Sequence, residues 1–392
     1  MIRAAYDVVV IGAGPAGSIA ARTCAQAGLR VLLVEKRQEI GSPVRCAEAV
    51  GKETVAEFMP LDAKWIAAEV DHFSLTSSQN DTIHFPPLET TLVLERKLFD
   101  RELALAAAQA GVDVVVKARA VGFIKNGTGL EGVRLIVQGQ PHDVRCTLVI
   151  GADGTEAQST RWAGLKAVPQ LKDYYSAAQF LLTDVNIAQN VCQYHLGWSI
   201  APAGYAWVFP KGNNTANVGL VIAVDPKQPR SAIDYLNDFV AKNFPQSSIL
   251  SQVVGGIPVS NVLPEMTADN YLAVGDAAHQ SDPLTAGGIT NGMTGGLFAA
   301  QTAIEALRRG DTSRKFLKKY EKRWDEKFGA DYRRLYRLRH AAFKIPEEKL
   351  NAIIQQVSQL DDPQPGMGQL FKIFLKEYPL LVVDIMPLLL GK

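Results

Sequence analysis

Three glycines near the start of the chain have the spacing of a phosphate-binding turn. The run Gly12-Ala13-Gly14-Pro15-Ala16-Gly17 follows an apolar stretch at 6–11 and precedes an Ala-rich segment that reaches about Gln26. Glycines in such a strand–turn–helix unit let backbone amides and the helix N-terminus approach a pyrophosphate. Glu35 ends the next predicted strand, at 31–34, where a carboxylate can accept hydrogen bonds from ribose hydroxyls. The unit predicts a dinucleotide site that disfavours a 2′-phosphate.

A second pattern of small and acidic residues lies more than 230 positions further on and requires a different ligand group. Gly275-Asp276-Ala277-Ala278 follows an apolar strand at 271–274, and Asp276 suits the hydroxyls of a ribityl chain. A small-residue segment with Gly287, Gly288 and Ile289 then leads into a helix that reaches about Arg308. Amides at the start of that helix can face the pyrimidine edge of a flavin, where reduction leaves negative charge. Together the two patterns predict FAD rather than NAD, and Asp153, in a polar turn after 148–150, is a third contribution.

Two further runs resemble one family of flavoproteins. The three motifs occur in the order found in the superfamily of aromatic hydroxylases and geranylgeranyl reductases. Pro43-Val44-Arg45-Cys46-Ala47-Glu48 and the run 202–212, with Tyr205-Ala206-Trp207-Val208-Phe209-Pro210-Lys211-Gly212, are similar to the geranylgeranyl reductase family. Within it they most resemble the archaeal-type digeranylgeranylglycerophospholipid reductases, which saturate isoprenoid chains of membrane lipids. The resemblance spans about residues 5–310.

The resemblance implies a set of FAD contacts, several of them through backbone atoms. Arg96 opens a predicted helix after a strand, from which its guanidinium can reach the phosphate–ribose region; a surface arginine is the alternative. Ala49 departs from the family, because many members carry glycine there. The implied contacts are Ala16, Glu35, Cys46, Ala47, Ala49, Arg96, Ala120, Asp276, Gly288 and Ile289, to which the motifs add Gly12, Gly14, Gly17, Arg45, Asp153 and Gly287.

Cys46, Tyr205 and Trp207 are the candidate catalytic residues. An isolated trisubstituted alkene is not polarised, so a hydride can add to it only if a proton arrives as well. Protonation builds carbocation character, which aromatic ring faces stabilise in a water-free site. Tyr205 and Trp207 alternate along one predicted strand and therefore point to the same face, either as this wall or as core. Tyr205 is also a possible proton donor, although its ordinary pKa is about 10. Cys46 is expected near the flavin as a proton donor, a flavin-tuning group or a packing residue.

Composition is compatible with a large globular chain. The 392 residues are 47% hydrophobic with a net charge of +1, which gives no indication of nucleic-acid binding. Four cysteines without a CxxC pair predict neither a zinc site nor a disulfide framework, and no other cluster has metal-ligand spacing. We expect no secretory signal and no transmembrane span, hence a cytoplasmic protein. His279 and His195 are isolated, and a structural role is favoured for His279 over a proton relay.

The predicted fold is α/β, with a discontinuous Rossmann-like FAD-binding domain, an inserted antiparallel β-sheet substrate domain and a C-terminal helical region. The FAD-binding domain comprises 1–68, 92–165 and 268–310, the substrate domain 69–91 and 166–267, and the helical region 311–392. Alternating β-branched and aromatic residues predict strands of the substrate domain at 73–76, 82–85, 176–182, 191–196, 205–210 and 215–224, with a hairpin turn at Asn213-Asn214.

The C-terminal region combines a basic stretch with an apolar tail. Residues 308–344 contain 14 Lys or Arg against 5 acids. They predict either a solvated helix with ion pairs or peripheral contact with anionic lipid, at roughly 1 kcal/mol per basic residue. The tail at 370–390 is interpreted as core, as a lid over a lipid tunnel or as an interfacial anchor.

We interpret the chain as an FAD-dependent reductase of geranylgeranyl C=C bonds, acting on a polyprenyl lipid. NAD(P)H or a ferredoxin-like carrier would supply the electrons, since no second dinucleotide fingerprint is visible. One alternative is an FAD-dependent monooxygenase or halogenase, which shares the cofactor motifs but uses oxygen. The other is a non-catalytic flavin-containing lipid carrier. Neither the headgroup, the number of double bonds reduced nor the oligomeric state follows from the sequence.

Overall fold

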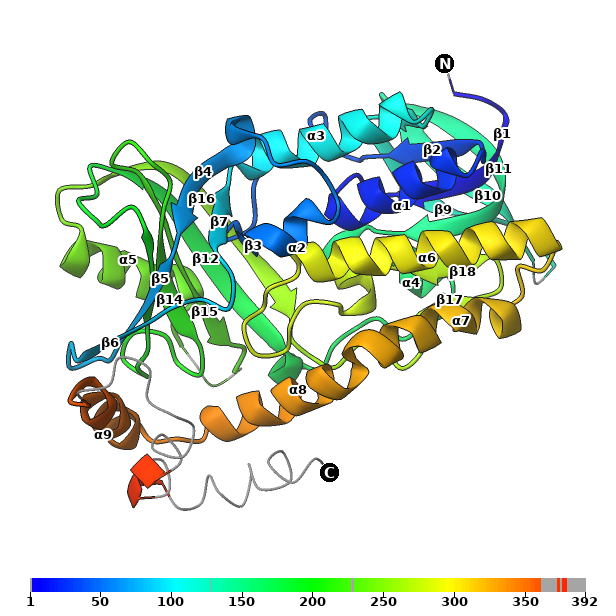
Figure 1. Cartoon of the computed structure of the whole chain (residues 1–392). Helices are drawn as coiled ribbons and strands as arrows, with labels where there is room; N and C mark the ends of the chain where they lie inside the picture. The colour runs from blue at the N-terminus through cyan, green and yellow to red at the C-terminus, as the bar shows by residue number, and fades with distance from the viewer. Residues whose placement is uncertain are drawn as a thin grey trace.

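The computed structural model describes residues 2–127, 129–225, 227, 229–360, 372–373 and 376–378. Its described part has one lobe built on a parallel-centred sheet, a second lobe built on a mostly antiparallel sheet, and helices along one side of both (Figure 1). This arrangement confirms the predicted α/β class with a Rossmann-like sheet, an antiparallel sheet and C-terminal helices. The proposed domain boundaries stay a prediction.

The first lobe is organised by what we call the Rossmann-like sheet. Its central strands are parallel and almost wholly apolar, as expected for strands covered on both faces. Helices α1 (Pro15–Gln26), α3 (Arg96–Gln109) and α6 (Ile289–Arg309) form a layer against it (Figure 1). The strands are β1 (Ala5–Ile11), β2 (Val31–Val34), β8 (Asp113–Val115), β9 (Ala118–Asn126), β10 (Gly129–Val137), β11 (Gln140–Gly151), β17 (Thr267–Ala268) and β18 (Tyr271–Ala273).

Glycines let helices and strands approach closely where β1 turns into α1. Gly12 has φ +106°, and a Cβ there would lie 2.2 Å from the carbonyl oxygen of Ala152. A Cβ on Gly17 would lie 1.9 Å from the oxygen of Gly12, and one on Gly296 of α6 2.2 Å from the oxygen of Ala16. The atoms that each added Cβ would meet belong to the backbone and cannot rotate away. The glycines therefore set how closely α1 packs on β11 and on α6.

The second lobe is built on what we call the insertion sheet, in the order β16-β12-β15-β14-β13-β5-β6. All the predicted strands of this region are present within one or two residues, and the Asn213-Asn214 turn has the positive φ values of a tight hairpin. Helix α5 (Ala232–Asn243) packs on one face. The strands are β5 (His72–Thr76), β6 (Thr82–Phe85), β12 (Tyr174–Thr183), β13 (Val191–His195), β14 (Tyr205–Pro210), β15 (Ala216–Ala223) and β16 (Ser248–Pro258), of which β16 was not predicted.

A small sheet of β3, β7 and β4 lies between the two lobes. Trp65 is fully buried here and meets Phe99 of α3 edge-to-face, with ring centroids 5.1 Å apart. Met293 of α6 belongs to the same apolar cluster, so this sheet is anchored to the helical layer of the first lobe. The elements are β3 (Ala49–Gly51), α2 (Lys52–Ala56), η1 (Ala63–Trp65), β4 (Ile66–Val70) and β7 (Thr91–Leu94).

The C-terminal helices run along the lower edge of both lobes in Figure 1. Helix α7 (Arg314–Trp324) continues through a π-helical turn, η5 (Asp325–Gly329), into α8 (Ala330–Ala342), and α9 (Glu347–Ser358) follows. In the described part of the chain no helix is long and apolar enough to cross a membrane. The predicted tail at 370–390 lies outside the described residues apart from 372–373 and 376–378.

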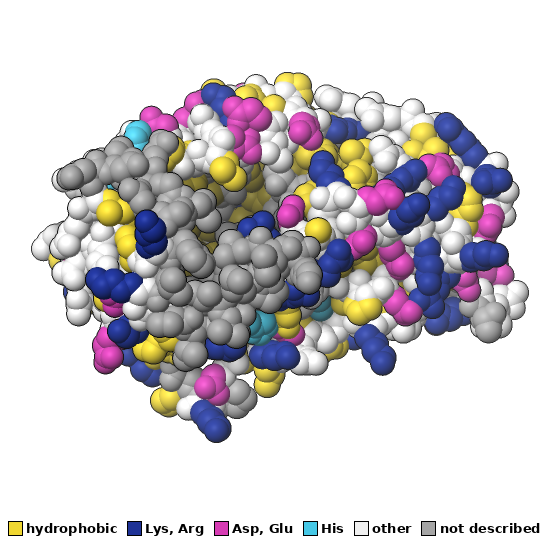
Figure 2. Space-filling model, turned by 60° about the horizontal axis from the view of Figure 1, so that its bottom comes forward, with side chains coloured by type: hydrophobic (Ala, Val, Ile, Leu, Met, Phe, Trp, Pro, Cys, Tyr) yellow, Lys and Arg dark blue, Asp and Glu magenta, His cyan; other side chains and the backbone are white. Residues whose placement is uncertain are grey.

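Acids from distant segments neutralise part of the basic stretch. Glu305 of α6 pairs with Lys319 and Arg323, and Glu265 pairs with Arg314. Basic and acidic side chains are accordingly interspersed over this face (Figure 2). Such pairing favours the interpretation as a solvated, ion-paired helix over a continuous cationic surface.

His195 of β13 is packed between the insertion sheet and α5. Its ring meets Phe239 edge-to-face with centroids 5.0 Å apart, and Nε2 is buried without a hydrogen-bond partner among the described residues. Burial lowers the pKa of His195 to about 4. This histidine is therefore neutral and structural.

His195 should make stability depend on pH in acid. The unfolded chain binds a proton below about pH 6.5, whereas the folded chain resists it down to about pH 4, so stability falls as pH drops through this window. The loss is at most about 3 kcal/mol, at 1.36 kcal/mol per pKa unit. Urea unfolding of His195→Phe between pH 4 and 7 should give a flatter profile. His142→Gln, at an exposed site, is the control, and an unchanged slope in His195→Phe would contradict the assignment.

Candidate functional site

A cavity of about 800 Å³ lies where the carboxyl ends of β1, β2 and β11 face the insertion sheet. Parallel strands place their following turns at one edge, which is why motifs far apart in sequence meet here. All the predicted site residues border this cavity, namely Gly12, Gly14, Ala16, Gly17, Glu35, Arg45, Cys46, Ala47, Ala49, Arg96, Ala120, Asp153, Tyr205, Trp207, Asp276, Gly287, Gly288 and Ile289.

The glycine turn and Glu35 form the first polar part of the cavity. A Cβ on Gly14 would meet no atom within 4 Å, so the backbone here is open to a ligand. Glu35 accepts hydrogen bonds from the amides of Ala13 and Arg37 at 3.2 and 3.0 Å, one to each carboxylate oxygen. These amides fix the carboxylate beside the turn. The arrangement can hold a pyrophosphate and an adjoining ribose.

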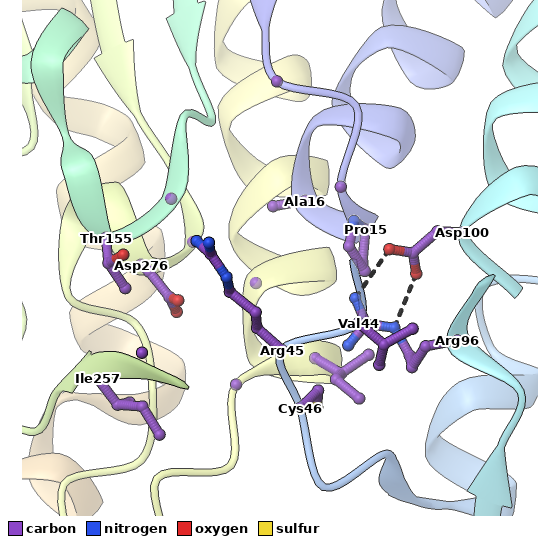
Figure 3. Close-up of a pocket in the computed structure, with 18 of the residues that line it drawn as sticks. Pro15, Ala16, Val44, Arg45, Cys46, Arg96, Asp100, Thr155, Ile257 and Asp276 are labelled. Carbon is purple, nitrogen blue, oxygen red and sulfur yellow. Dashed lines mark hydrogen bonds and ion pairs between the residues drawn. The ribbon is translucent and has the colours of Figure 1, made fainter. Parts of the chain in front are cut away.

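Asp276 forms the second polar part of the cavity. In Figure 3 it lies near the end of the Arg45 side chain, to one side of Pro15 and Ala16. It lies in η4 (Gly275–Ala278), and its carboxylate has no hydrogen-bond partner among the described residues. Burial raises the pKa of Asp276, whereas the charge of Arg96 acts to lower it. Asp276 is half-buried and borders the cavity, so a hydroxyl-bearing ligand there could donate hydrogen bonds to its carboxylate.

Hydrogen bonds from the C-terminal helices hold the loop that carries Asp276. Gln280 accepts a hydrogen bond from the amide of Gly275 at 2.7 Å and donates to the hydroxyl of Tyr320 at 2.7 Å. Tyr332 of α8 donates to the carbonyl of Gln280 and accepts from Asn291 at the start of α6. Thus α7 and α8 hold both the acidic loop and the N-terminus of α6 in place.

Two predicted cofactor contacts already have protein partners. Arg96 forms a bidentate pair with Asp100, with Nε–Oδ1 and Nη2–Oδ2 distances of 2.8 and 2.9 Å (Figure 3). Burial opposes the charged form, but the Asp100 carboxylate prevails and raises the pKa of Arg96. Asp153 accepts hydrogen bonds from the amide and hydroxyl of Ser159, both at 2.8 Å, at the start of α4 (Gln158–Trp162). Both side chains are held in place by the protein at the cavity wall.

Arg45 crosses the cavity instead. Its side chain is exposed and extends toward Asp276 and Thr155, away from Cys46 (Figure 3). Its stem runs beside Gly255 of β16, where a Cβ would lie 3.9 Å from Arg45 Cδ. The Arg45 guanidinium therefore reaches the polar side of the cavity on an extended side chain.

Cys46 lies on the loop between the polar side and the insertion sheet. Its Sγ accepts a hydrogen bond from the amide of Glu48 at 3.3 Å, which leaves the thiol proton available to the cavity. Burial raises the pKa of Cys46, while the Arg96 guanidinium acts to lower it. The thiol is therefore protonated at neutral pH.

Aromatic rings line the opposite wall. Tyr205 and Trp207 are on the same face of β14, as the alternation predicts, with ring centroids 6.0 Å apart. Tyr194 and Phe209 extend this wall, with centroids 5.9 Å from Tyr205 and 6.4 Å from Trp207 respectively. The Tyr205 hydroxyl donates to the carbonyl of Thr285, and burial raises the pKa of Tyr205. Both features make it a weak acid.

Several functional positions were missed from sequence. Phe73 of β5 and Tyr194 of β13 border the cavity, as does the segment 253–257 of β16. The alternation that selected Tyr205 and Trp207 continues to Phe209, so that residue was accessible to the same reasoning. The segment 253–257 follows polar residues and contains Gly255-Gly256, which masks a strand pattern.

The second isolated histidine, His279, is structural. It is buried, with Nδ1 2.7 Å from the Ser260 hydroxyl and Nε2 3.0 Å from the Ala167 carbonyl oxygen. Both ring nitrogens are therefore occupied within the protein. Among the described residues no group of His, Cys, Asp and Glu is arranged to hold a metal ion.

Two family models and several reductases match this chain. Residues 7–167 match the family described as FAD dependent oxidoreductase, and residues 173–257 match the geranylgeranyl reductase catalytic domain. The chain is 42% identical over 391 residues to digeranylgeranylglycerophospholipid reductase 1 of Methanococcoides burtonii, covering 99% of this chain and 96% of that protein. It is 41% identical over 395 residues to the digeranylgeranylglycerophospholipid reductase of Methanocella arvoryzae, covering 99% and 100%.

Solved structures give the same result. A geranylgeranyl bacteriochlorophyll reductase-like protein from Thermoplasma acidophilum superposes with a TM-score of 0.90 at 36% identity, covering 97% of this chain and 98% of that one. A flavin-dependent brominase superposes with a TM-score of 0.65 at 21% identity, covering 99% and 94%. At that identity the second likeness concerns the fold alone.

Proposed function

The chain belongs to the geranylgeranyl reductase family of FAD-dependent oxidoreductases, and from this we propose that it saturates C=C bonds in the geranylgeranyl chains of a digeranylgeranylglycerophospholipid. The observation that carries the proposal is one cavity with a dinucleotide cradle on one side and an aromatic wall on the other. A reductase of unactivated alkenes requires both surfaces at once.

We assign FAD to the polar side of the cavity. The open backbone at Gly14 and the amide-fixed carboxylate of Glu35 suit the adenosine diphosphate part. The unpartnered carboxylate of Asp276 suits the ribityl hydroxyls, and Gly288, at the N-terminus of α6, suits the electron-rich edge of the ring. Ala16, Ala47, Ala49, Ala120, Gly287 and Ile289 would contribute backbone and small-side-chain contacts.

The protein's own residues would supply the proton and the environment of the reaction. Reduced FAD, when bound, supplies a hydride. We assign the proton to Cys46, since its thiol is protonated, borders the cavity and donates no hydrogen bond to any residue that the structure describes. Tyr205 and Trp207 would exclude water and stabilise positive charge developing on the alkene. The Tyr205 hydroxyl, which donates to Thr285, would position the wall rather than donate a proton.

An apolar edge beside the cavity supports a lipid substrate. Strand β16 is the edge strand of the insertion sheet and contributes 253–257 to the cavity wall. It leaves Ile249, Leu250 and Val254 more than half exposed. Exposed apolar side chains along a sheet edge are a liability unless they have a use. Here these side chains would receive the hydrocarbon chain of a lipid at a membrane surface. The electrons would come from NAD(P)H or a ferredoxin-like carrier.

We predict anaerobic turnover of the lipid. Chemically reduced holoprotein, mixed under strict anaerobiosis with a digeranylgeranylglycerophospholipid, should be reoxidised while mass spectrometry shows products heavier by two hydrogens per double bond. The fully saturated lipid is the control and should leave the flavin reduced. A reaction that proceeds only with oxygen, or that yields hydroxylated or halogenated product, would instead identify a monooxygenase or halogenase. Flavin that no prenyl lipid reoxidises would identify a non-catalytic carrier.

Asp276→Ala should weaken FAD binding. The loss of a hydrogen bond to a charged group, about 1.5–3 kcal/mol, corresponds to a rise in Kd of at least about tenfold. Titration of apoprotein with FAD, followed by flavin fluorescence, measures it. Asp276→Asn should be less impaired, and Asp143→Ala, on the exposed part of β11, should bind as the natural protein does. Equal affinity in Asp276→Ala would remove this residue from the flavin site.

A further inference from the structure

A buried polar network lies behind the Cys46 loop. Lys211, at the end of the β14–β15 hairpin, is 3.0 Å from Glu48 and 2.9 Å from Glu95 through its Nζ. The Lys211 and Glu48 side chains are only 4% and 6% exposed. The other carboxylate oxygen of Glu48 accepts the amide of Arg96 at 3.0 Å. Three segments of the chain therefore converge on a single carboxylate.

Asn217 of β15 connects this network to the loop backbone. Its Nδ2 donates to the carbonyls of Cys46 and Ala47 at 3.2 and 3.3 Å and lies 3.0 Å from Glu48 Oε2. Its Oδ1 accepts the indole N–H of Trp207 at 3.2 Å. The indole thereby fixes which way the amide points, because an amide flipped by 180° would turn its oxygen toward the loop carbonyls. The Asn217 side chain thus contacts both the aromatic wall and the Cys46 loop.

We propose that Glu48, Lys211 and Asn217 are positioning residues that hold the Cys46 thiol at a fixed place against the aromatic wall. This inference rests on the proposed role of Cys46 in alkene reduction. It adds that the loop is positioned from the insertion sheet, through the hairpin, rather than from the cofactor side.

Backbone geometry explains why such a clamp is needed. Glu48 has φ +74°, a left-handed conformation that is strained for a residue with a side chain. In this conformation the Glu48 amide points back to Cys46 Sγ and its side chain points to Lys211. Without the buried partners the loop would relax to a less strained conformation, and the thiol would lose its place.

Burial of the cluster makes its members interdependent. Removing one partner of a buried ion pair leaves an uncompensated charge, whereas removing both is far less harmful. The Lys211→Met change strands Glu48 in the interior, while in Glu48→Gln/Lys211→Met no charge of the pair remains. The double variant should therefore unfold at a higher urea concentration than Lys211→Met alone, and the same or a lower midpoint would argue against the buried pair.

Alkylation of Cys46 tests the positioning directly. Cys24, Cys146 and Cys192 are buried, so iodoacetamide should modify Cys46 first in the folded holoprotein, with Cys46→Ala giving the background. The titratable groups facing the thiol are Arg96 and Asp100 of α3, Glu48 of its own loop and Tyr205 of β14. The rate is followed from pH 6 to 10 by mass spectrometry.

Asn217→Leu should release the loop, relieve the burial that raises the thiol pKa, and increase the alkylation rate at pH 8 roughly tenfold, because the thiolate is the nucleophile. Its kcat for lipid reduction should fall about tenfold or more, while KM stays within about threefold, because the aromatic rings that would contact the substrate remain. FAD affinity should fall less than in Asp276→Ala, because the loop supplies only a few of the proposed FAD contacts. Thr215→Ala is the matched control: its hydroxyl donates to Gly212 within the same hairpin and does not contact the loop. It should match the natural protein in both measurements.

Glu48 supplies a second pair of variants in case Asn217→Leu folds poorly. Glu48→Gln keeps one acceptor oxygen, enough for either the Arg96 amide or Asn217 but not for both. It should therefore retain more activity and slower alkylation than Glu48→Ala, which keeps none. Natural alkylation profiles in Asn217→Leu and Glu48→Ala would overturn the positioning role. Altered profiles with unchanged kcat would instead keep the positioning role and remove Cys46 from the reaction.

Discussion

The geometry of the cavity depends on the buried contacts of the Glu48 carboxylate, because they connect the insertion sheet with the first lobe. The carboxylate receives Lys211 from the insertion sheet and the amide of Arg96 from the start of α3. Burial raises the pKa of Glu48, although the charge of Lys211 acts to lower it. A buried charge is tolerated only with its partners in place, so Lys211 and the start of α3 must both stay within hydrogen-bond distance of the Glu48 carboxylate.

The parts that could be predicted are those whose geometry is local. The glycine turn, α1, β2 and Glu35 form one continuous unit, and each element constrains the next. Alternation was sufficient for β14 and for the common face of Tyr205 and Trp207. The partners of Arg96 and Asp153 were also only four and six residues away, but nothing in composition distinguishes a side chain that binds a neighbouring residue from one that binds a cofactor.

The parts that could not be predicted depend on contacts between distant segments. Lys211 and Asn217 contact Glu48 although more than 160 residues separate them from it in the sequence. Lys211 lies in the run that resembles the family, but the sequence alone indicates no role for it. The basic stretch is a second case, because Glu305 and Glu265 come from outside it. Counting charges within a window therefore overestimated its free positive charge. Strand β16 was missed for another reason: the Gly255-Gly256 pair and the exposed apolar residues Ile249, Leu250 and Val254 together hide the usual alternation of a sheet-edge strand.

The chemistry of Cys46 follows from two opposing effects. A thiol beside a guanidinium would ordinarily lose its proton more readily, but Arg96 is already neutralised by the bidentate Asp100 pair, and burial has the larger effect. The protein thus keeps a cation near the loop without making Cys46 a thiolate. For the proton donation that we propose for Cys46 this is the useful outcome, because a proton donor must retain its proton until charge develops on the substrate. An aromatic wall that excludes water would serve the same purpose, since it would disfavour the separated charge of a thiolate until a cationic centre lies beside it.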